Sequence, residues 1–472
     1  MDEQQRTPNK EPMRRKKRSL ERMIKEDYLP YVICGMTLLL VIIFIGGAIG
    51  RAVEQNRAEE IAASIAAAEA EAEAQRQHEQ AIMQLIANAD SMMDAYNYEG
   101  ARTLLETYAH EMNDFPALQA KYNECVELID SLVEWDNLAD VVSMSFHTLI
   151  VDPDRAFSNA EYGTSFSSNH ITCSEFTSIL ASLYENNYVL IDLDDIVSIT
   201  EDATGNVTVA PKSIFLPQGK KPLMLTETNV NYYSYMVDGD GDGLADEDGA
   251  GFAHKLVLSE EGAVTAQYIT PDGETVTGDY DLVPILERFI SLHPDFSYKG
   301  ARAILAVTGL EGIFGYRIDS DAKKSMSDAA FEQEVDGAKA IVAALQGKGY
   351  TIACNTYGNL AYGKLKAADI QADLEKWQND IAPIIPDVDI FVYAKNSQLL
   401  GDDYSSPKYT ALKDAGFKVF LGFNSKAELW AQMNADYVRA DRILVTGSSL
   451  TKNKDWYSGL FNPKTILDPA RD

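Results

Sequence analysis

Two apolar runs of the sequence, residues 222–233 and 349–359, end in small polar side chains that could form one site. These side chains are Thr228, Asn229, Asn355 and Asn359. Buried parallel strands deliver such groups to a common site at their C-terminal ends. Amide oxygens are neutral, weak ligands that suit hard ions, whereas zinc-type hydrolysis needs anionic or imidazole ligands. The pattern therefore predicts a polar site without ligand charge of its own.

The two runs resemble the first two motifs of the polysaccharide deacetylases, the carbohydrate esterase family 4 or NodB-homology domain. In that family the first strand ends Thr-Phe-Asp-Asp-Gly and the second ends His-Ser/Thr-x-x-His. Thr226 keeps the threonine, while Thr228 and Asn229 occupy the two aspartate positions. Asn355 and Asn359 occupy the two histidine positions. The resemblance implies a kept scaffold with degenerate metal and base positions.

In the family, the second aspartate and the two histidines hold a divalent metal, and the first aspartate is the general base. A threonine hydroxyl at Thr228 cannot replace that base near neutral pH. Glu227 is the nearby carboxylate, but neighbouring strand positions point to opposite faces. Tyr393 loosely matches the tyrosine that helps to hold the oxyanion, and no histidine follows His293 to fill the family's late motif. The implied enzyme class is a carbohydrate N-deacetylase, and whether this chain is an enzyme stays open.

Other stretches extend the resemblance over about residues 140–472. Residues 141–147 read as an opening barrel strand, and residues 172–192 read as a helix followed by a strand. Residues 409–420 read as a helix that leads into a late strand. We therefore expect an α/β fold, a distorted (β/α)7-type barrel with an insertion at about 237–281, preceded by a transmembrane helix and a helical stalk.

The N-terminal part predicts a membrane anchor. No charged residue occurs from Tyr28 to Gly50, which is long enough to cross a bilayer core. Residues 1–29 form a basic tail with nine Lys/Arg against six Asp/Glu and should stay in the cytoplasm. We therefore expect a single-pass transmembrane helix at 30–50 and an extracytoplasmic C-terminal domain. A cleaved signal peptide is the alternative, although its apolar region is normally shorter.

The segment after the span predicts helices. Residues 51–80 are almost all Ala, Glu, Gln and Arg and predict a solvated stalk. Residues 81–136 have helical spacing and resemble a tetratricopeptide-like hairpin. Because one hairpin buries little apolar surface, it should pack on the barrel or on a second copy, which allows self-association through the stalk.

The net charge of the chain limits the kinds of ligand that its surface could bind. The 472-residue chain has a formal net charge of −31, and the basic tail leaves about −34 for the rest. Such a surface repels nucleic acid and acidic wall polymers, and it favours calcium or neutral sugars or simply keeps an exposed protein soluble. The four cysteines form no CxxC motif, a pattern common in Gram-positive surface proteins.

An Asp/Gly loop at residues 237–249 has carboxylates at calcium-loop spacing: Asp238, Asp240, Asp242 and Asp246. Gly249 stands where such a loop needs a bidentate Glu, and Asp-Gly repeats also make exposed turns. Ca²⁺ in this loop is one interpretation, and plain turns are the other. No cofactor is expected at the old catalytic positions.

Several side chains near the predicted site could contact a ligand. The tyrosine candidates are Tyr232, Tyr233, Tyr235, Tyr316 and Tyr357. Aromatic faces stack well on sugar rings, although tyrosines at barrel rims also serve as packing. Glu311 and Arg317 are further candidates, and Arg317 can equally pair with a carboxylate.

Three functions are compatible with the sequence. The favoured one is a membrane-anchored, deacetylase-like pseudoenzyme that engages cell-wall glycan, or a surface protein, through the old cleft. The second is an active deacetylase with relocated catalytic groups, such as Glu227 or Glu311. The third is a structural or assembly protein that works through its stalk.

Overall fold

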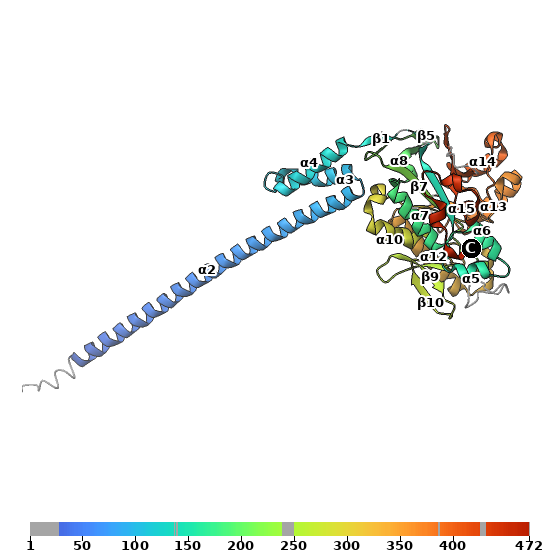
Figure 1. Cartoon of the computed structure of the whole chain (residues 1–472). Helices are drawn as coiled ribbons and strands as arrows, with labels where there is room; N and C mark the ends of the chain where they lie inside the picture. Colours follow the sequence, from blue (N-terminus) through green and yellow to red (C-terminus); the bar gives the residue numbers. More distant parts are fainter. Residues whose placement is uncertain are drawn as a thin grey trace, which may run out of the picture. The chain divides into compact units, whose positions relative to one another are not determined.

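The computed structural model describes residues 28–135, 137, 140–237, 250–385, 388–424 and 431–471. The chain divides into two units, Met1–Gln84 and Leu85–Asp472, and each is described by itself. The first unit consists, in its described part, mainly of the long helix α2, Leu29–Asp94, which continues into the second unit (Figure 1). One 18-residue window of α2 has a mean hydropathy of 2.7, so this helix is a candidate membrane span. The expected boundaries after residues 50 and 80 fall within this one helix.

The second unit opens with a short helical region, α3 (Tyr98–Glu106) and α4 (Pro116–Asp130). Asn97 begins α3 by accepting a hydrogen bond from the Gly100 N–H at 3.1 Å, a common N-cap arrangement. Leu105 and Leu118 are fully buried where the helices pack.

Hydrogen bonds tie this region to the segment that precedes β11. The Tyr96 hydroxyl donates to Asp295 at 3.4 Å, and the Lys299 N–H donates to the Ala95 carbonyl at 2.7 Å. The end of α2 is therefore fixed by contacts within the second unit.

Seven parallel strands form a closed barrel in the second unit. In order around the barrel they are β2 (Val142–His147), β7 (Lys221–Thr228), β11 (Ile304–Val307), β12 (Thr351–Cys354), β13 (Ile390–Val392), β14 (Val419–Asn424) and β16 (Val438–Leu444). The pairing of β16 with β2 closes the ring. The short strand β3 (Tyr188–Leu190) pairs with the start of β7. The expected (β/α)7-type barrel is confirmed.

Alternation along each strand separates an inner from an outer face of the barrel. In β7, Leu223 and Leu225 belong to the hydrophobic core outside the ring, so Met224, Thr226 and Thr228 point inwards. The registers carry this assignment around the barrel. The inward positions are Ser143, Ser145, His147, Met224, Thr226, Thr228, Ile304, Ala306, Thr351, Ala353, Ile390, Val392, Val419, Leu421, Phe423, Val438, Ala440, Arg442 and Leu444.

Helices cover the outer face through their buried apolar side chains. The longer ones are α7 (Cys173–Glu185), α10 (Leu282–Leu292), α12 (Asp328–Gly347), α13 (Ala367–Asp380) and α14 (Pro407–Asp414). The shorter helices are α5 (Pro153–Ser158), α6 (Gly163–Asn169), α8 (Leu193–Ile196), α9 (Ser234–Val237), α11 (Ser320–Ser325), α15 (Gly447–Lys452) and α16 (Pro463–Ile466).

Small antiparallel sheets decorate the barrel. In the expected insertion the described part holds a three-stranded sheet of β8 (Lys255–Leu258), β9 (Val264–Ile269) and β10 (Thr275–Gly278). The others are β1 (Val133–Trp135) with β6 (Ile214–Leu216), β4 (Val197–Glu201) with β5 (Val207–Pro211), and β15 (Ala431–Met433), which pairs with β16. The Asp/Gly loop with Asp238, Asp240, Asp242 and Asp246 lies outside the described residues.

Candidate ligand-binding site at the barrel mouth

The loops that follow β7, β11, β12 and β13 hold most of the strained backbone. Of the eleven non-glycine residues with positive φ in the described chain, eight lie there: Asn229, Tyr232, Glu311, Phe314, Thr356, Asn359, Lys395 and Asn396. Such conformations cost free energy and cluster at functional sites. We call the C-terminal ends of β2, β7, β11 and β12, with the loops 229–233, 308–317 and 355–359, the barrel mouth.

Thr228 and His147 form a hydrogen-bonded pair at the ends of two neighbouring strands. The Thr228 hydroxyl donates to the Phe146 carbonyl at 3.0 Å, so its oxygen is left to accept from His147 Nδ1 at 2.7 Å. This assigns the proton of the imidazole to Nδ1 and leaves the Nε2 lone pair as an acceptor. Burial, the neighbouring His170 and the Arg442 charge lower the pKa of His147 to about 3. His147 is therefore neutral at physiological pH.

Asn229 lies beside this pair in a left-handed turn. Its Nδ2 is 3.4 Å from His147 Nδ1, and its Oδ1 is 3.4 Å from the Tyr233 hydroxyl. The same hydroxyl is 2.8 Å from Thr308 Oγ1. Tyr233 therefore connects the loop after β7 with the end of β11 through neutral groups only.

Asn355 follows β12, on the other side of β11 from β7. It is 1% exposed, its backbone N–H donates to the Val307 carbonyl at 2.8 Å, and its Nδ2 donates to the Val392 carbonyl at 2.7 Å. Asn359 is half-buried in the loop that follows. The structure thus places Asn229, Asn355 and Asn359 at one end of the barrel, around β11.

These residues do not fit a catalytic transition metal. The three amides supply no negative charge, and the Asn355 side chain already uses its amino group to hold the barrel backbone. Among the described residues, no group of three or more His, Cys, Asp or Glu side chains could hold a metal ion. The donor chemistry instead suits hydrogen bonds to a polar ligand.

Glu227 points away from the mouth, into the outer layer. It is fully buried and faces Asp281, which itself accepts from the backbone N–H groups of Leu149 at 3.0 Å and Leu282 at 2.9 Å and from the Tyr232 hydroxyl. Burial and the Asp281 charge raise the pKa of Glu227 well above its ordinary value, so its carboxyl group stays protonated near the Asp281 carboxylate, and neither of its oxygens has a hydrogen-bond partner among the described residues. It does not reach the barrel interior as a base.

Glu311 and Arg317 join the loops after β7 and β11. Glu311 Oε2 accepts from the Ser234 N–H at 2.6 Å and lies 3.7 Å from Arg317 Nη1. Arg317 donates to the carbonyls of Glu311 at 2.8 Å and Tyr232 at 2.6 Å. Both charged side chains therefore hold the loops of the mouth together.

An aromatic wall rises at one side of the mouth. The Tyr233 and Tyr235 rings stack with centroids 5.7 Å apart and planes at 15°, and Tyr235 stacks in turn on Phe166 at 6.0 Å and 14°. Tyr162 is 5.3 Å from Tyr235. We call these four rings the aromatic wall. Tyr162 and Tyr235 are half-buried, so part of the wall is accessible.

The remaining tyrosine candidates are engaged in other contacts. These are Tyr232 with Asp281, Tyr316 with Lys255 at 4.1 Å from its ring, Tyr357 with Asp380 at 2.7 Å, and Tyr393 with Tyr404 at 2.8 Å. Tyr393 packs in the outer core because it shares the outward face of Phe391. Its hydroxyl is thereby directed away from the mouth.

Arg442 is a site residue that the sequence reasoning missed. It lies inside the barrel, 3% exposed, and its Nε donates to Ser145 Oγ at 3.1 Å. Its Nη1 donates to the carbonyls of Leu421 at 2.6 Å and Gly422 at 2.9 Å, and its Nη2 to that of Tyr393 at 3.1 Å. Burial lowers its pKa to about 10, so the guanidinium stays charged at neutral pH.

The strand pattern contains the signal for Arg442. In residues 438–444, alternation places Arg442 on the face of Val438 and Ala440, which are apolar. His147 was visible as the last residue of the opening strand, but nothing in the sequence pairs it with Thr228.

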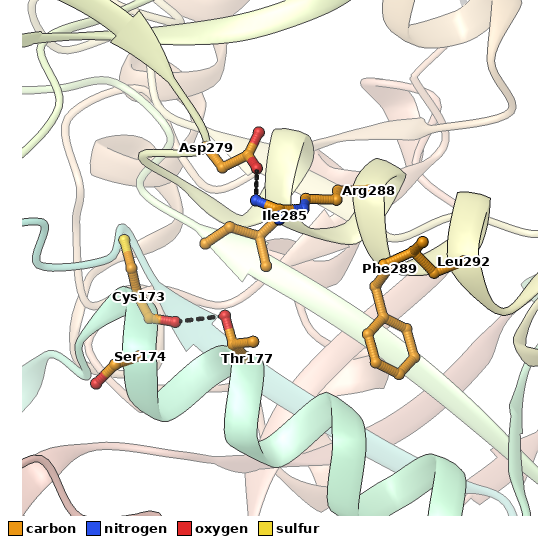
Figure 2. A pocket seen from close by; sticks show the side chains of 8 residues that line it. All are labelled: Cys173, Ser174, Thr177, Asp279, Ile285, Arg288, Phe289 and Leu292. Carbon is orange, nitrogen blue, oxygen red and sulfur yellow. Dashed lines mark hydrogen bonds and ion pairs between the residues drawn. The ribbon is translucent and has the colours of Figure 1, made fainter.

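The outer helices form a separate groove. A cavity of about 420 Å³ lies between Cys173, Ser174 and Thr177 on α7 and the α10 side, as Figure 2 shows. The α10 side is lined by Asp279, Ile285, Arg288, Phe289 and Leu292. Burial raises the pKa of the Cys173 thiol well above its ordinary value, so this thiol is a poor nucleophile.

Comparison with known proteins gives one structural likeness to report. No family model and no curated protein matches the chain. It is similar to the solved structure titled "Streptococcus pyogenes deacetylase PplD in complex with acetate", with 10% identity over 70% of this chain and 98% of that chain and a TM-score of 0.33. The barrel assignment rests on the strand pairings of this chain itself.

Proposed function

We propose that this chain is a membrane-anchored, polysaccharide-deacetylase-like protein that binds cell-wall glycan in its barrel mouth without metal-dependent hydrolysis. The observation that carries the proposal is the donor set of the mouth. Thr228, Asn229 and Asn355 are neutral and already joined to neighbouring groups, and Glu227 is turned to the other face of its strand.

The aromatic wall supports a carbohydrate ligand. Stacked, half-buried rings such as Tyr235 and Tyr162 offer flat apolar faces, and the adjacent amides and hydroxyls supply hydrogen bonds. Sugar rings need both, because one face is apolar and the rim is polar.

The apolar part of α2 supports the membrane anchor. Together with the basic tail before it, it favours a cytoplasmic N-terminus and an extracytoplasmic barrel. This location would bring the mouth to the cell-wall glycan.

A binding and turnover measurement tests the proposal. The full chain, purified in mild detergent, is titrated with chitooligosaccharide and with peptidoglycan glycan strands, and acetate release is followed with Zn²⁺, Co²⁺ or Mn²⁺ added. We expect saturable binding and no acetate. Tyr235→Ala should weaken binding, while Tyr122→Ala, in the helical region at α4, should not. Binding to neither glycan would favour the structural or assembly role.

An active hydrolase with relocated groups is the second candidate, and His147 is the observation that favours it. A neutral imidazole with its Nε2 lone pair at the mouth has the chemistry of a general base. Metal-independent acetate release that is lost in His147→Gln would support this candidate. Acetate release that needs an added metal would contradict the proposal of a metal-free mouth.

A further inference from the structure

The barrel interior contains one charged side chain among its described inward positions, and it is a cation. Arg442 donates four hydrogen bonds, all to neutral acceptors: the Ser145 hydroxyl and three backbone carbonyls. None of the described inward positions of the seven strands carries a carboxylate. Carbonyl dipoles offset part of the cost of burying a guanidinium, and the Asp441 charge, from the neighbouring outward position of β16, acts on Arg442 from outside these inward positions.

One polar side chain close to Arg442 lacks a hydrogen-bond partner. Thr226, in register with Ser145, is fully buried, and its hydroxyl has no hydrogen-bond partner among the described residues. The Ser143 hydroxyl also has no hydrogen-bond partner among the described residues, but it faces a cavity of about 30 Å³ at the other end of the barrel. This cavity has room for one water molecule. Thr226 and Arg442 therefore form a polar centre beneath the mouth, in which one hydroxyl is free to donate or to accept.

The charge of Arg442 reaches the mouth. His147 is the next inward position after Ser145 on β2, and the Arg442 charge contributes, after burial and His170, to the low pKa of His147. A buried charge is screened by salt far less than the acidic surface, where the screening length is about 8–10 Å. Arg442 therefore contributes a positive charge beneath the mouth although the chain is strongly acidic.

We propose that the barrel mouth recognises a carboxylate on its ligand, with Arg442 as the fixed charge beneath it. This inference rests on the proposed function and names the ligand class: an acidic glycan rather than a neutral one. The half-buried, neutral amide of Asn229 then positions the sugar without repelling the anion. The net charge of the chain favoured neutral sugars, and the charge inside the barrel reverses that expectation for the mouth.

Three matched ligands test the inference on the unaltered full chain in detergent. They are chitooligosaccharide, a glycan strand of the same length in which alternate sugars carry a lactyl carboxylate, and the methyl ester of that strand. We expect the acid to bind about tenfold or more tightly than the other two, as a charge-assisted hydrogen bond would give. Equal affinity for all three overturns the inference and leaves glycan binding standing. Binding to none overturns both.

Variants then assign the effect to Arg442. Arg442→Gln should bring the acid and ester affinities together, and Arg442→Lys should keep part of the preference because the charge remains. Arg439→Gln, on the outward side of the same strand, is the matched control and should leave the ratio unchanged. Folding of each variant is checked by circular dichroism. An unchanged ratio in folded Arg442→Gln would leave Arg442 a purely structural role and overturn the assignment.

Discussion

The inner and outer faces of the barrel differ in the charge state of their buried ionisable side chains. On the inner face, Arg442 is a buried cation that donates only to neutral acceptors, and Asp441 acts on it from the neighbouring outward position of the strand. On the outer face, Glu227 is a buried acid whose partner is a second acid, Asp281. The inner group cannot lose its charge near neutral pH, because an arginine keeps its proton. The carboxyl group of Glu227, in contrast, is uncharged because it keeps its proton.

Arg442 is therefore a lasting source of positive charge inside the barrel, whereas the buried Glu227 carboxyl group is a neutral part of the outer layer. The carboxyl group of Glu227 is the conspicuous ionisable group next to the deacetylase-like motif, yet it is neutral and faces the helices. Apart from the Glu311–Arg317 pair in the loops, the charge near the mouth comes from Arg442 on the last strand, where no motif drew attention to it. Proximity in sequence to a motif is therefore a weaker guide than the face of the strand.

Removing the inner cation should have the largest effect on stability. Arg442→Ala leaves a cavity and strips four acceptors of their donor, which we expect to lower the free energy of unfolding by about 3–5 kcal/mol. The measurement is the urea midpoint of the full chain in detergent. Arg439→Ala, which loses a contact with the Tyr404 ring and an exposed hydrogen bond to Gln432, should cost about 1 kcal/mol or less. Equal losses of unfolding free energy in the two variants would show that the inward and outward positions of β16 contribute alike to stability.

Returning charge to the inner face should create a metal site. The variant Thr228→Asp, Asn229→Asp, Asn355→His, Asn359→His should gain at least about a hundredfold in zinc affinity, or ~3 kcal/mol, over the natural chain. Isothermal titration with Zn²⁺ measures this, with Thr228→Asp alone as the control. Zinc bound as tightly by the natural chain would contradict the neutral mouth.

Replacing the Glu227 carboxyl group with an amide should stabilise the protein in a pH-dependent way. The pKa of Glu227 in the folded state is above its ordinary value of 4.5, so the stability it supports is complete below pH 4.5 and falls as the pH rises toward the folded pKa. Glu227→Gln does not titrate and should be more stable than the natural chain by about 1–2 kcal/mol at pH 8, with little difference at pH 4.

Thermal melts across this pH range measure the effect. Glu274→Gln, at an exposed position of the insertion, serves as the control and should follow the natural profile. If the difference in thermal stability between Glu227→Gln and the natural chain were the same at every pH, the pKa of Glu227 would not differ between the folded and unfolded states.

The smallest effect is expected at the aromatic wall. Tyr235→Ala should weaken binding of glycan strands by about 1 kcal/mol, or roughly fivefold, because one stacking face is lost. Tyr235→Phe keeps that face and should bind nearly as well. Loss of binding in both variants to the same degree would place the hydroxyl, not the ring, against the ligand.

Much of the fold could be predicted because parallel strands buried on both faces have short apolar runs with polar ends. Thr228 and Asn355 stood out for that reason, and the structure places both at the same end of the barrel. Tyr232 was predicted to contact a ligand because it lies close to the site loops in sequence, and Tyr393 was a candidate because it loosely matches the family's oxyanion tyrosine. Their side chains turn to the outer layer because a left-handed turn reorients Tyr232 and the strand register reorients Tyr393.

The sequence by itself determined the apolar helix, the strand periodicity and the absence of charged side chains at positions 228, 229, 355 and 359, since these depend on residue type and local spacing. Only the tertiary structure decided that His147 donates to Thr228 and that a guanidinium from the last strand lies beneath the mouth. Both depend on the closure of the ring, which brings strands almost 300 residues apart into register, and no local pattern encodes which distant neighbours will meet.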